Sequence, residues 1–321
     1  MSEAGATGEL AVGKPGDNAL TPAVLREPLR SIRKKLPLRV LSQADFEHWQ
    51  TYGFVVVRGA VPEGNVAALT KLLWEFQEMD PEDVVTWGAA QLRSHAMTEL
   101  NNSGMVEIYN HQALWDNRQE QRVYDAFVDI WDEERLWVTI DRANLNTPNK
   151  SGRAFAGFIH TDVDTTLDPL PVNVQGVLSL VDVDGETGGF QCVPELFRSF
   201  EAWKVRQPEG RDGFRPDVSE FEVYPVPMKA GDLMIFNSLL AHGIRPNTSA
   251  DKVRMAQYIS MTPAAEENDA LRELRVQSWK ERRAPEGFAF PGDPREWERT
   301  KYATAVLTPL GRKLLGVDSW G

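Results

Sequence analysis

Apolar and polar residues repeat with two different periods along the chain, and the helical period comes first. Ser42 precedes ADFEHWQTYG, which predicts a capped short helix that ends at Gly53. Residues 65–79 and 118–137 space their apolar side chains as amphipathic helices do. Between them, residues 54–59 form a β-branched run that ends in glycine, which predicts a strand.

The second period begins near Trp137 and is that of short strands separated by Gly, Pro, Asn and Asp. Helical segments come before strands instead of alternating with them, which argues against a doubly wound parallel sheet. We therefore expect a mainly β fold with flanking helices, in a single domain over 25–321. Its β core covers about 137–263 and a helical extension follows at the C-terminal end. Residues 1–24 are rich in Gly, Ala and Glu without any period, which predicts a mobile tail.

Composition and charge narrow the function classes. Lys and Arg number 35 against 47 Asp and Glu, so the formal net charge is −12, and we expect neither a nucleic acid nor an anionic membrane as partner. No apolar run is long enough for a spanning helix, and the N-terminus lacks the pattern of a signal peptide. The single cysteine, Cys192, forms no intramolecular disulfide and favours the reducing cytoplasm. A homodimer is the default expectation for the assembly.

Two residues in the segment FIHTDVD could form part of a metal site. If residues 156–164 form a strand, His160 and Asp162 point to the same face, and imidazole and carboxylate converge on one point. These are two of the three ligands of a 2-His-1-carboxylate triad, which leaves open positions on iron. Alone, a histidine two residues from an acid is a weak signal in a chain this rich in Asp and Glu.

A later histidine and an arginine make the signal more specific. His242 follows the apolar run DLMIFNSL, at a strand end from which a side chain can point into the mouth of a barrel. Arg254 lies in the next strand pattern, VRMAQYISM, where its planar guanidinium group could bind the distal carboxylate of a dicarboxylate. The ordered set of a His-x-Asp strand, a glycine turn, a strand ending in histidine and a strand arginine is much rarer than its parts.

On these residues the sequence resembles the phytanoyl-CoA dioxygenase-like family of Fe(II)/2-oxoglutarate-dependent dioxygenases. The resemblance covers roughly residues 45–265, from FEHWQTYGFVVVRGAVPEGNVAAL through HTD and ETGGFQCVPELFR to KAGDLMIFNSLLAHGIRPN and Arg254. Two positions depart from the family pattern. Pro194-Glu195-Leu196-Phe197 stands where members often have Pro-Gly-Ser-His, and Ala256 stands where some have a serine.

The resemblance implies a double-stranded β-helix of the jelly-roll or cupin-like type, and an oxidative mechanism. His160, Asp162 and His242 would hold Fe(II), and 2-oxoglutarate would chelate the metal with its far carboxylate on Arg254. O₂ would then oxidise a substrate, with release of succinate and CO₂. Because Asp162 is retained, oxygenation is favoured over the halogenation of relatives that lack this carboxylate. Desaturation, epoxidation and cyclisation stay open.

Other residues are candidates for contacts with the cosubstrate or the substrate. Gln175, in VQGVLSL, could contact the cosubstrate or be a buried structural glutamine. His111 and Trp115 lie in a polar, aromatic stretch without a period, which could form a lid over the barrel or pack onto the core. Arg142 and Asn144 alternate on one face of WVTIDRANLN and could face the interior.

The sequence thus predicts an iron and 2-oxoglutarate oxygenase that hydroxylates a small organic molecule. The acidic surface offers no obvious site for the phosphates of an acyl-CoA, which favours natural-product tailoring. Two alternatives stay open: a jelly-roll protein that binds a ligand without catalysis, and a cupin-like metal-dependent lyase or isomerase. The lyase would not need Arg254.

Overall fold

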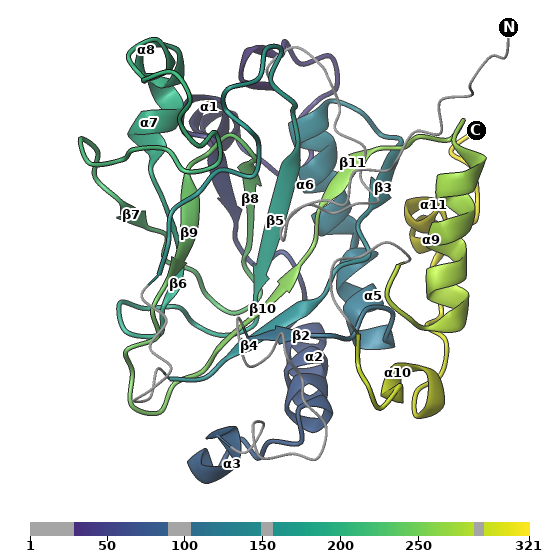
Figure 1. The fold of residues 1–321 in the computed structure, drawn as a ribbon. Helices are drawn as coiled ribbons and strands as arrows, with labels where there is room; N and C mark the ends of the chain where they lie inside the picture. The colour runs from purple at the N-terminus through teal and green to yellow at the C-terminus, as the bar shows by residue number, and fades with distance from the viewer. Residues whose placement is uncertain (1–28, 89–103, 149–156, 286–291) are drawn as a thin grey trace, which may run out of the picture.

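The computed structural model describes residues 29–88, 104–148, 157–285 and 292–321. Two antiparallel β-sheets form its centre (Figure 1). The six-stranded major sheet has the order β1-β8-β5-β10-β4-β2. Its strands are Phe54–Val57 (β1), Met105–Val106 (β2), Ala143–Asn146 (β4), Val174–Ser179 (β5), Leu233–Asn237 (β8) and Arg254–Tyr258 (β10).

The minor sheet has three strands in the order β7-β6-β9. They are Gly189–Cys192 (β6), Tyr224–Pro225 (β7) and His242–Arg245 (β9). A separate pair joins β3 (Leu136–Val138) to β11 (Met261–Pro263). Two facing antiparallel sheets make a jelly roll, so the predicted fold class is confirmed.

The first helix forms as its sequence predicts. α1 covers Gln43–Tyr52, and the Ser42 side chain accepts the Asp45 N–H in a capping box. Gly53 ends the helix with φ 81°, a left-handed conformation that favours glycine. β1 follows at once and pairs with β8 from Phe54 opposite Phe236, so the predicted strand at 54–59 is confirmed.

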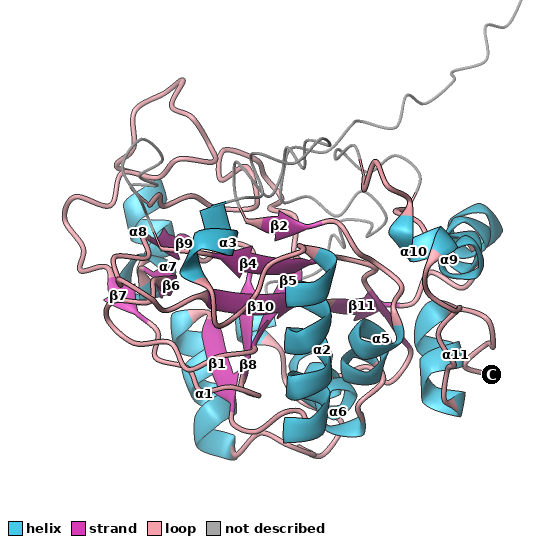
Figure 2. Cartoon of the chain, turned by 90° about the horizontal axis from the view of Figure 1, so that it is seen from below, coloured by secondary structure: helices cyan, strands magenta, loops and turns pink. Residues whose placement is uncertain are grey.

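Helices cover the outer face of the major sheet, as Figure 2 shows for α2, α5 and α6. α2 spans Glu63–Phe76, α5 spans Gln112–Arg118 and α6 spans Gln121–Trp131. Their apolar faces bury side chains against the sheet in the larger hydrophobic core, which includes Leu69, Leu73, Phe76, Leu114, Phe127, Ile130, Leu178, Leu233, Ile235 and Met255. Burial of this amphipathic stripe is what stabilises such helices.

The stretch 80–117 is more regular than the sequence suggested. It contains α3 (Val84–Gly88), β2 and α5. α5 is short, and its helical spacing is hidden because polar residues in it are buried: Asn117 and Arg118 are both fully inaccessible. Its polar groups find partners inside the protein, which a pattern of apolar residues alone does not reveal.

A second core fills the space between the two sheets. It is formed by side chains that point inward from both sheets, among them Val177, Phe190, Cys192, Met234, Phe236 and Ala256. α7 (Pro194–Arg198) and α8 (Phe200–Lys204) follow β6. The segment Pro194 to Phe197, which departs from the family pattern, thus begins a short helix instead of a loop.

The C-terminal part adds three helices on one side of the molecule (Figure 1). They are α9 (Asp269–Glu281), α10 (Trp297–Thr300) and α11 (Pro309–Leu315). Residues 1–24 lie outside the described residues, and the expected tail is therefore not tested. Within the described ranges, none of the helices is both long enough and apolar enough to cross a membrane.

Candidate metal centre

His160, Asp162 and His242 meet at one end of the space between the sheets. Each offers one ligand atom, and these atoms all lie within 4.8 Å of one another. His160 Nε2 lies 3.0 Å from Asp162 Oδ1, and His242 Nε2 lies 3.4 Å from Asp162 Oδ2. Two imidazole nitrogens and one carboxylate, all on one face of the metal, form the donor set that suits non-haem Fe(II). The opposite face stays open for other ligands. The residues therefore fit the metal that the sequence predicts.

The protein environment keeps two of these groups in the state that a metal needs. Burial opposes ionisation of Asp162, but the neighbouring His242 and the hydrogen bonds of His160 and Gln175 outweigh it, so the pKa of Asp162 lies below its usual value. Burial lowers the pKa of His242, although Asp162 acts in the opposite direction. A carboxylate and a neutral imidazole are the forms that coordinate a metal.

The His-x-Asp segment reaches this position without forming a regular strand over 157–164, so the condition on which its two side chains were expected to converge is not met, although they do converge. It is held by an isolated bridge in which His160 and His242 exchange backbone hydrogen bonds of 2.8 Å in both directions. A Cβ atom on Gly243 would lie only 1.7 Å from the carbonyl oxygen of Phe158. A glycine is therefore required at 243 for the segment to pack this closely against β9.

The ring of His242 is fixed by its surroundings. Its Nδ1 lies 2.9 Å from the carbonyl oxygen of Leu240, and since a carbonyl oxygen only accepts, Nδ1 is the donor. The other nitrogen, Nε2, is thus the free electron-pair donor that faces Asp162. Phe190 stacks on the ring at 5.2 Å and Phe236 lies at 4.5 Å, between centroids. These contacts hold the ring and keep water from its sides.

The triad is open on the side of His160. The side chain of His160 is 29% exposed, whereas those of Asp162 and His242 are each 8% exposed. The Phe158 ring lies 4.9 Å from that of His160 and is itself exposed. A substrate would therefore approach the metal past these two side chains.

Gln175 contacts a triad residue. Its side-chain amide donates to Asp162 Oδ2, so it orients this carboxylate in the way that partners of metal ligands commonly do. Gln175 is half-buried, and its predicted contact with the cosubstrate stays a prediction.

Arg254 lies deeper between the sheets, on the same inner face. It is 3% exposed, and its Nη1 donates to Asn144 Oδ1 over 2.9 Å. β10 returns from Arg254 towards the triad end, because Tyr258 pairs with Val177 and Gln175 lies two residues nearer that end. Arg254 and Gln175, the partner of Asp162, therefore lie on the inner face of the same sheet and towards opposite ends of it.

Asn144 and Arg142, both predicted to line a substrate pocket, have different surroundings in the structure. Asn144 contacts Arg254 and is 0% exposed, so it positions the arginine. The backbone of Arg142 lies at the level of Tyr258, whose N–H donates to its carbonyl oxygen, and its Nε lies 3.4 Å from Asp141 Oδ1. Its charge acts on Tyr109 of the larger core, so the side chain is not shown to face the triad. Of the two, Arg142 is the one nearer the triad end.

His111 and Trp115 belong to α5, and the prediction that they line the pocket needs correction. Trp115 is fully buried in the outer core and donates to Asn110 Oδ1. His111 caps α5 by accepting the Ala113 N–H, and its ring lies against Tyr302, 4.7 Å between centroids. Both therefore pack the segment onto the core, on the helical side of the major sheet, because the segment folds into a helix instead of a lid.

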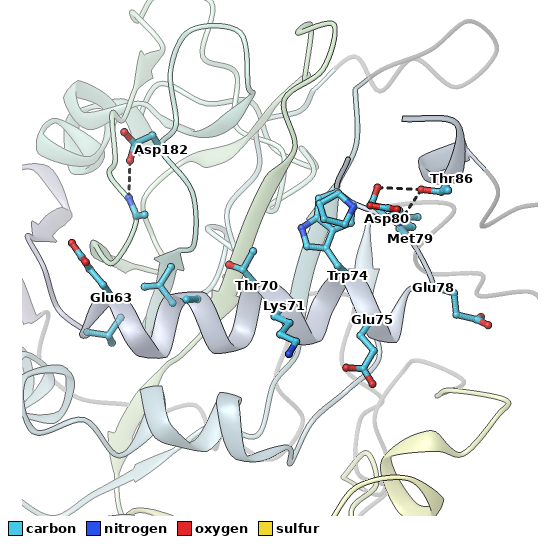
Figure 3. Close-up of a pocket in the computed structure, with 15 residues that line it drawn as sticks. Glu63, Thr70, Lys71, Trp74, Glu75, Glu78, Met79, Asp80, Thr86 and Asp182 are labelled. Carbon is cyan, nitrogen blue, oxygen red and sulfur yellow. Dashed lines mark hydrogen bonds between the residues drawn. The ribbon is translucent and has the colours of Figure 1, made fainter. Parts of the chain in front are cut away.

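A broad cleft lies away from the triad, along the exposed side of α2 (Figure 3). Its volume is ≈ 1170 Å³, and its described lining includes neither a triad residue nor Arg254. Several acidic side chains on its rim are paired with basic ones: Glu75 with Lys301 at 2.9 Å, Glu78 with Arg295 at 3.1 Å and Asp182 with Lys229 at 2.8 Å. The size of a cleft alone does not identify an active site, and the convergent polar groups lie elsewhere.

A 2-His-1-carboxylate set inside a jelly roll defines the class of non-haem iron enzymes. The chain belongs to the phytanoyl-CoA dioxygenase (PhyH) family, whose model matches residues 49–256. The predicted family is therefore confirmed. With the assembled triad, this membership makes the protein an enzyme that depends on iron and 2-oxoglutarate, with O₂ as the oxidant.

Individual relatives are distant. "Ava biosynthesis cluster protein O" of Aspergillus versicolor is 22% identical over 234 residues, which cover 66% of this chain and 74% of that protein. The structure of GlcNAc Inducible Gene 2 from Candida albicans superposes with a TM-score of 0.62 at 13% identity, covering 86% of this chain and 76% of that one. Protein JW0805 of Escherichia coli gives a TM-score of 0.60 at 14% identity, with 86% and 82% covered. At these identities the two structures show the shared fold alone.

Sequence reasoning missed several residues around the site. Gly243 could have been noticed because it follows a predicted ligand directly. Phe190 and Phe236 belong to strand patterns but carry no sign that they would contact His242. Tyr258 shares the inner face of β10 with Arg254, as the two-residue period of a strand requires, and this position could have been read from the sequence.

Proposed function

We propose that the protein hydroxylates a small organic molecule, with Fe(II) held by His160, Asp162 and His242 and with 2-oxoglutarate bound between the metal and Arg254. The observation that carries the proposal is the convergence of the three ligand atoms within 4.8 Å, with a buried arginine on β10, the strand next to the one that carries Gln175. The arginine favours an oxygenase over a lyase, because a lyase would have no use for a dicarboxylate cosubstrate.

Each residue has a defined part in this proposal. When bound, iron with 2-oxoglutarate and O₂ supplies the oxidation of an unactivated C–H bond, with succinate and CO₂ as coproducts. Asp162 provides the negative charge that offsets the cation, and Gln175 holds its carboxylate in place. His160 and His242 provide neutral nitrogen donors. Arg254 binds the distal carboxylate with its planar group, and Asn144 holds that group in position.

The proposed substrate is a small natural product. A formal net charge of −12 disfavours an acyl-CoA with its several phosphates. The exposed ring of Phe158 beside His160 offers an apolar surface at the open side of the triad. The relative from Aspergillus versicolor is named for a biosynthesis cluster, which agrees with a role in tailoring.

The test is to supply ¹⁸O₂ to the iron-loaded protein with 2-oxoglutarate and a panel of small natural products. A hydroxylase forms succinate that contains one heavy oxygen atom and a product that contains the other. Succinate formation is measured for the wild type and for Asp162→Ala, which lacks the anionic ligand.

The matched control is Asp164→Ala, since Asp164 belongs to the same segment but is not part of the triad. We expect Asp164→Ala to retain succinate formation and Asp162→Ala to lose it. Iron-dependent turnover that survives in Asp162→Ala would contradict the assignment of the triad. A product that gains no oxygen while succinate forms would replace hydroxylation by desaturation or cyclisation.

A further inference from the structure

The inner face of β10 carries a tyrosine hydroxyl, that of Tyr258, which has no part in the proposed function above. Arg254, Ala256 and Tyr258 alternate along this face, which packs against the core between the two sheets. The Tyr258 hydroxyl is buried and has no hydrogen-bond partner among the residues that the structure describes. A buried hydroxyl without a partner is unfavourable, so it is available to an acceptor that the described residues do not supply.

The position of Tyr258 along the strand places it between Arg254 and the triad. Its backbone pairs with Val177, and Gln175, which contacts Asp162, is the next inward-facing residue of β5 towards the triad. At a rise of about 3.3 Å per residue, the backbones of Arg254 and Tyr258 lie about 13 Å apart along the strand.

The guanidinium group of Arg254 reduces this separation. It binds Asn144, whose backbone pairs with Ala256, halfway between Arg254 and Tyr258. Between these two longer side chains, the inner face of β10 carries only the methyl group of Ala256. One carboxylate group can therefore lie between the guanidinium group and the phenol.

We infer that the Tyr258 hydroxyl donates a hydrogen bond to the distal carboxylate of 2-oxoglutarate, and that Tyr258 and Arg254 together position this cosubstrate. The inference rests on the proposed function, because it takes 2-oxoglutarate as the molecule between Arg254 and the triad. A neutral donor beside a guanidinium group suits a carboxylate, which has lone pairs for both. The apolar neighbours Val177 and Phe190 exclude water and strengthen this bond.

The experiment measures binding without turnover. The full-length protein is loaded with Fe(II) under anaerobic conditions and titrated with 2-oxoglutarate and, separately, with 2-oxobutanoate, which has the same oxo-acid group but no distal carboxylate. Tyr258→Phe removes only the unpaired oxygen and is compared with Arg254→Ala. Tyr124→Phe is the matched control, since Tyr124 lies on α6, outside the space between the sheets, and its hydroxyl donates to the Glu134 carbonyl oxygen.

We expect Tyr258→Phe to raise the Kd of 2-oxoglutarate about tenfold or more, as loss of a hydrogen bond to a charged group does. The Kd of 2-oxobutanoate should stay unchanged, and Tyr124→Phe should match the wild type with both ligands. An unchanged Kd of 2-oxoglutarate in Tyr258→Phe, while Arg254→Ala binds weakly, would overturn the role of Tyr258 and leave the proposed function intact.

Two further outcomes would also overturn the inference. An equal loss for both ligands would move the contact of Tyr258 from the distal carboxylate to the oxo-acid end. If the iron-loaded wild type binds no 2-oxoglutarate, the proposed function itself fails, and the role of Tyr258 fails with it.

Discussion

Buried charges occur in two regions of this protein and are satisfied in different ways. On the helical side, Asp129 of α6 is fully buried and accepts the backbone N–H groups of Arg39, Val40 and Leu41, at 2.8, 2.9 and 2.9 Å. At the triad, Asp162 is almost as inaccessible, but its partners are the side chains of two histidines and a glutamine.

The arginines show the same contrast. Arg275 of α9 is 2% exposed and donates to the backbone carbonyl oxygens of Leu315, Val138 and Leu314. Arg254 is 3% exposed, and its Nη1 donates to the side chain of Asn144. Charges that bind backbone groups join segments of the chain, whereas charges that face other side chains across a common space are available for ligands. The partners of a buried charged residue therefore indicate better than its burial whether the residue stabilises the fold or binds a ligand.

The largest effect is expected when a charge of the triad is removed. Asp162→Ala should weaken Fe(II) binding by more than about a hundredfold, because even the partners of metal ligands are worth about 10–100-fold. The free energy of unfolding of the metal-free protein should change by less than about 1 kcal/mol, since burial lowers the pKa of His242 and the neutral ring needs no counter-charge. Equilibrium metal titration and denaturant unfolding measure the two quantities. A large loss of stability with unchanged metal affinity would show that Asp162 stabilises the fold and does not bind the metal.

Removal of the arginine at the other end should have the next largest effect. Arg254→Ala should weaken 2-oxoglutarate binding about a hundredfold, as truncation of one partner of a buried charge pair does. Arg254→Lys should recover part of this loss, because it keeps the charge but not the planar, two-pronged geometry. Calorimetric titration gives the affinities. Binding that is equal in all three proteins would show that 2-oxoglutarate does not use this arginine.

The opposite pattern is expected on the helical side. Asp129→Ala leaves buried N–H groups without an acceptor and should cost about 3 kcal/mol in the free energy of unfolding. The affinities of the folded protein for Fe(II) and 2-oxoglutarate should not change. Asp125→Ala is the control on the same helix, since its more exposed ion pair with Arg39 should be worth about 1 kcal/mol or less. Lost affinity in fully folded Asp129→Ala would break the distinction between the regions.

The smallest effect concerns pH. Burial holds the pKa of His242 below its ordinary 6.5, despite the opposing effect of Asp162. Between the folded pKa and 6.5 the unfolded chain binds more protons at this residue than the folded protein does. The stability of the metal-free protein should therefore fall as the pH decreases below 6.5, by at most about 1.4 kcal/mol per pH unit. Denaturant unfolding at several pH values should show a shallower dependence for His242→Gln, and an identical dependence would exclude His242 as the cause.

The features that could be predicted from the sequence are those that depend on short motifs or on an ordered series of rare residues. The capped helix before Gly53, the strand at 54–59 and the set His160, Asp162 and His242 could be predicted because each depends on a few residues close in sequence or on an ordered series of rare ones. The assembled triad matches that series, although the segment that carries His160 is not a strand. Its geometry depends on a bridge to β9 and on Gly243, which are tertiary contacts.

The remaining residues could not be placed because their partners lie far away in the chain. Trp115 and His111 resemble pocket residues in a stretch without a period, yet tertiary packing folds that stretch into α5. Asn144 appears as one polar residue on a strand, and only the pairing of β4 with β10 reveals that it holds Arg254. Asp129 gives no signal at all, since an acid in a helix is usually exposed.

The most direct test of the account is an anaerobic titration of the purified protein with Fe(II) and 2-oxoglutarate, followed by the weak visible charge-transfer band of the chelate. The account predicts that the band appears with the wild type, is lost in His160→Ala, and in Arg254→Ala appears only at much higher 2-oxoglutarate concentrations. Absence of the band with correctly folded wild-type protein, or a band that is unchanged in both variants, would contradict the claim that these residues hold iron and its cosubstrate.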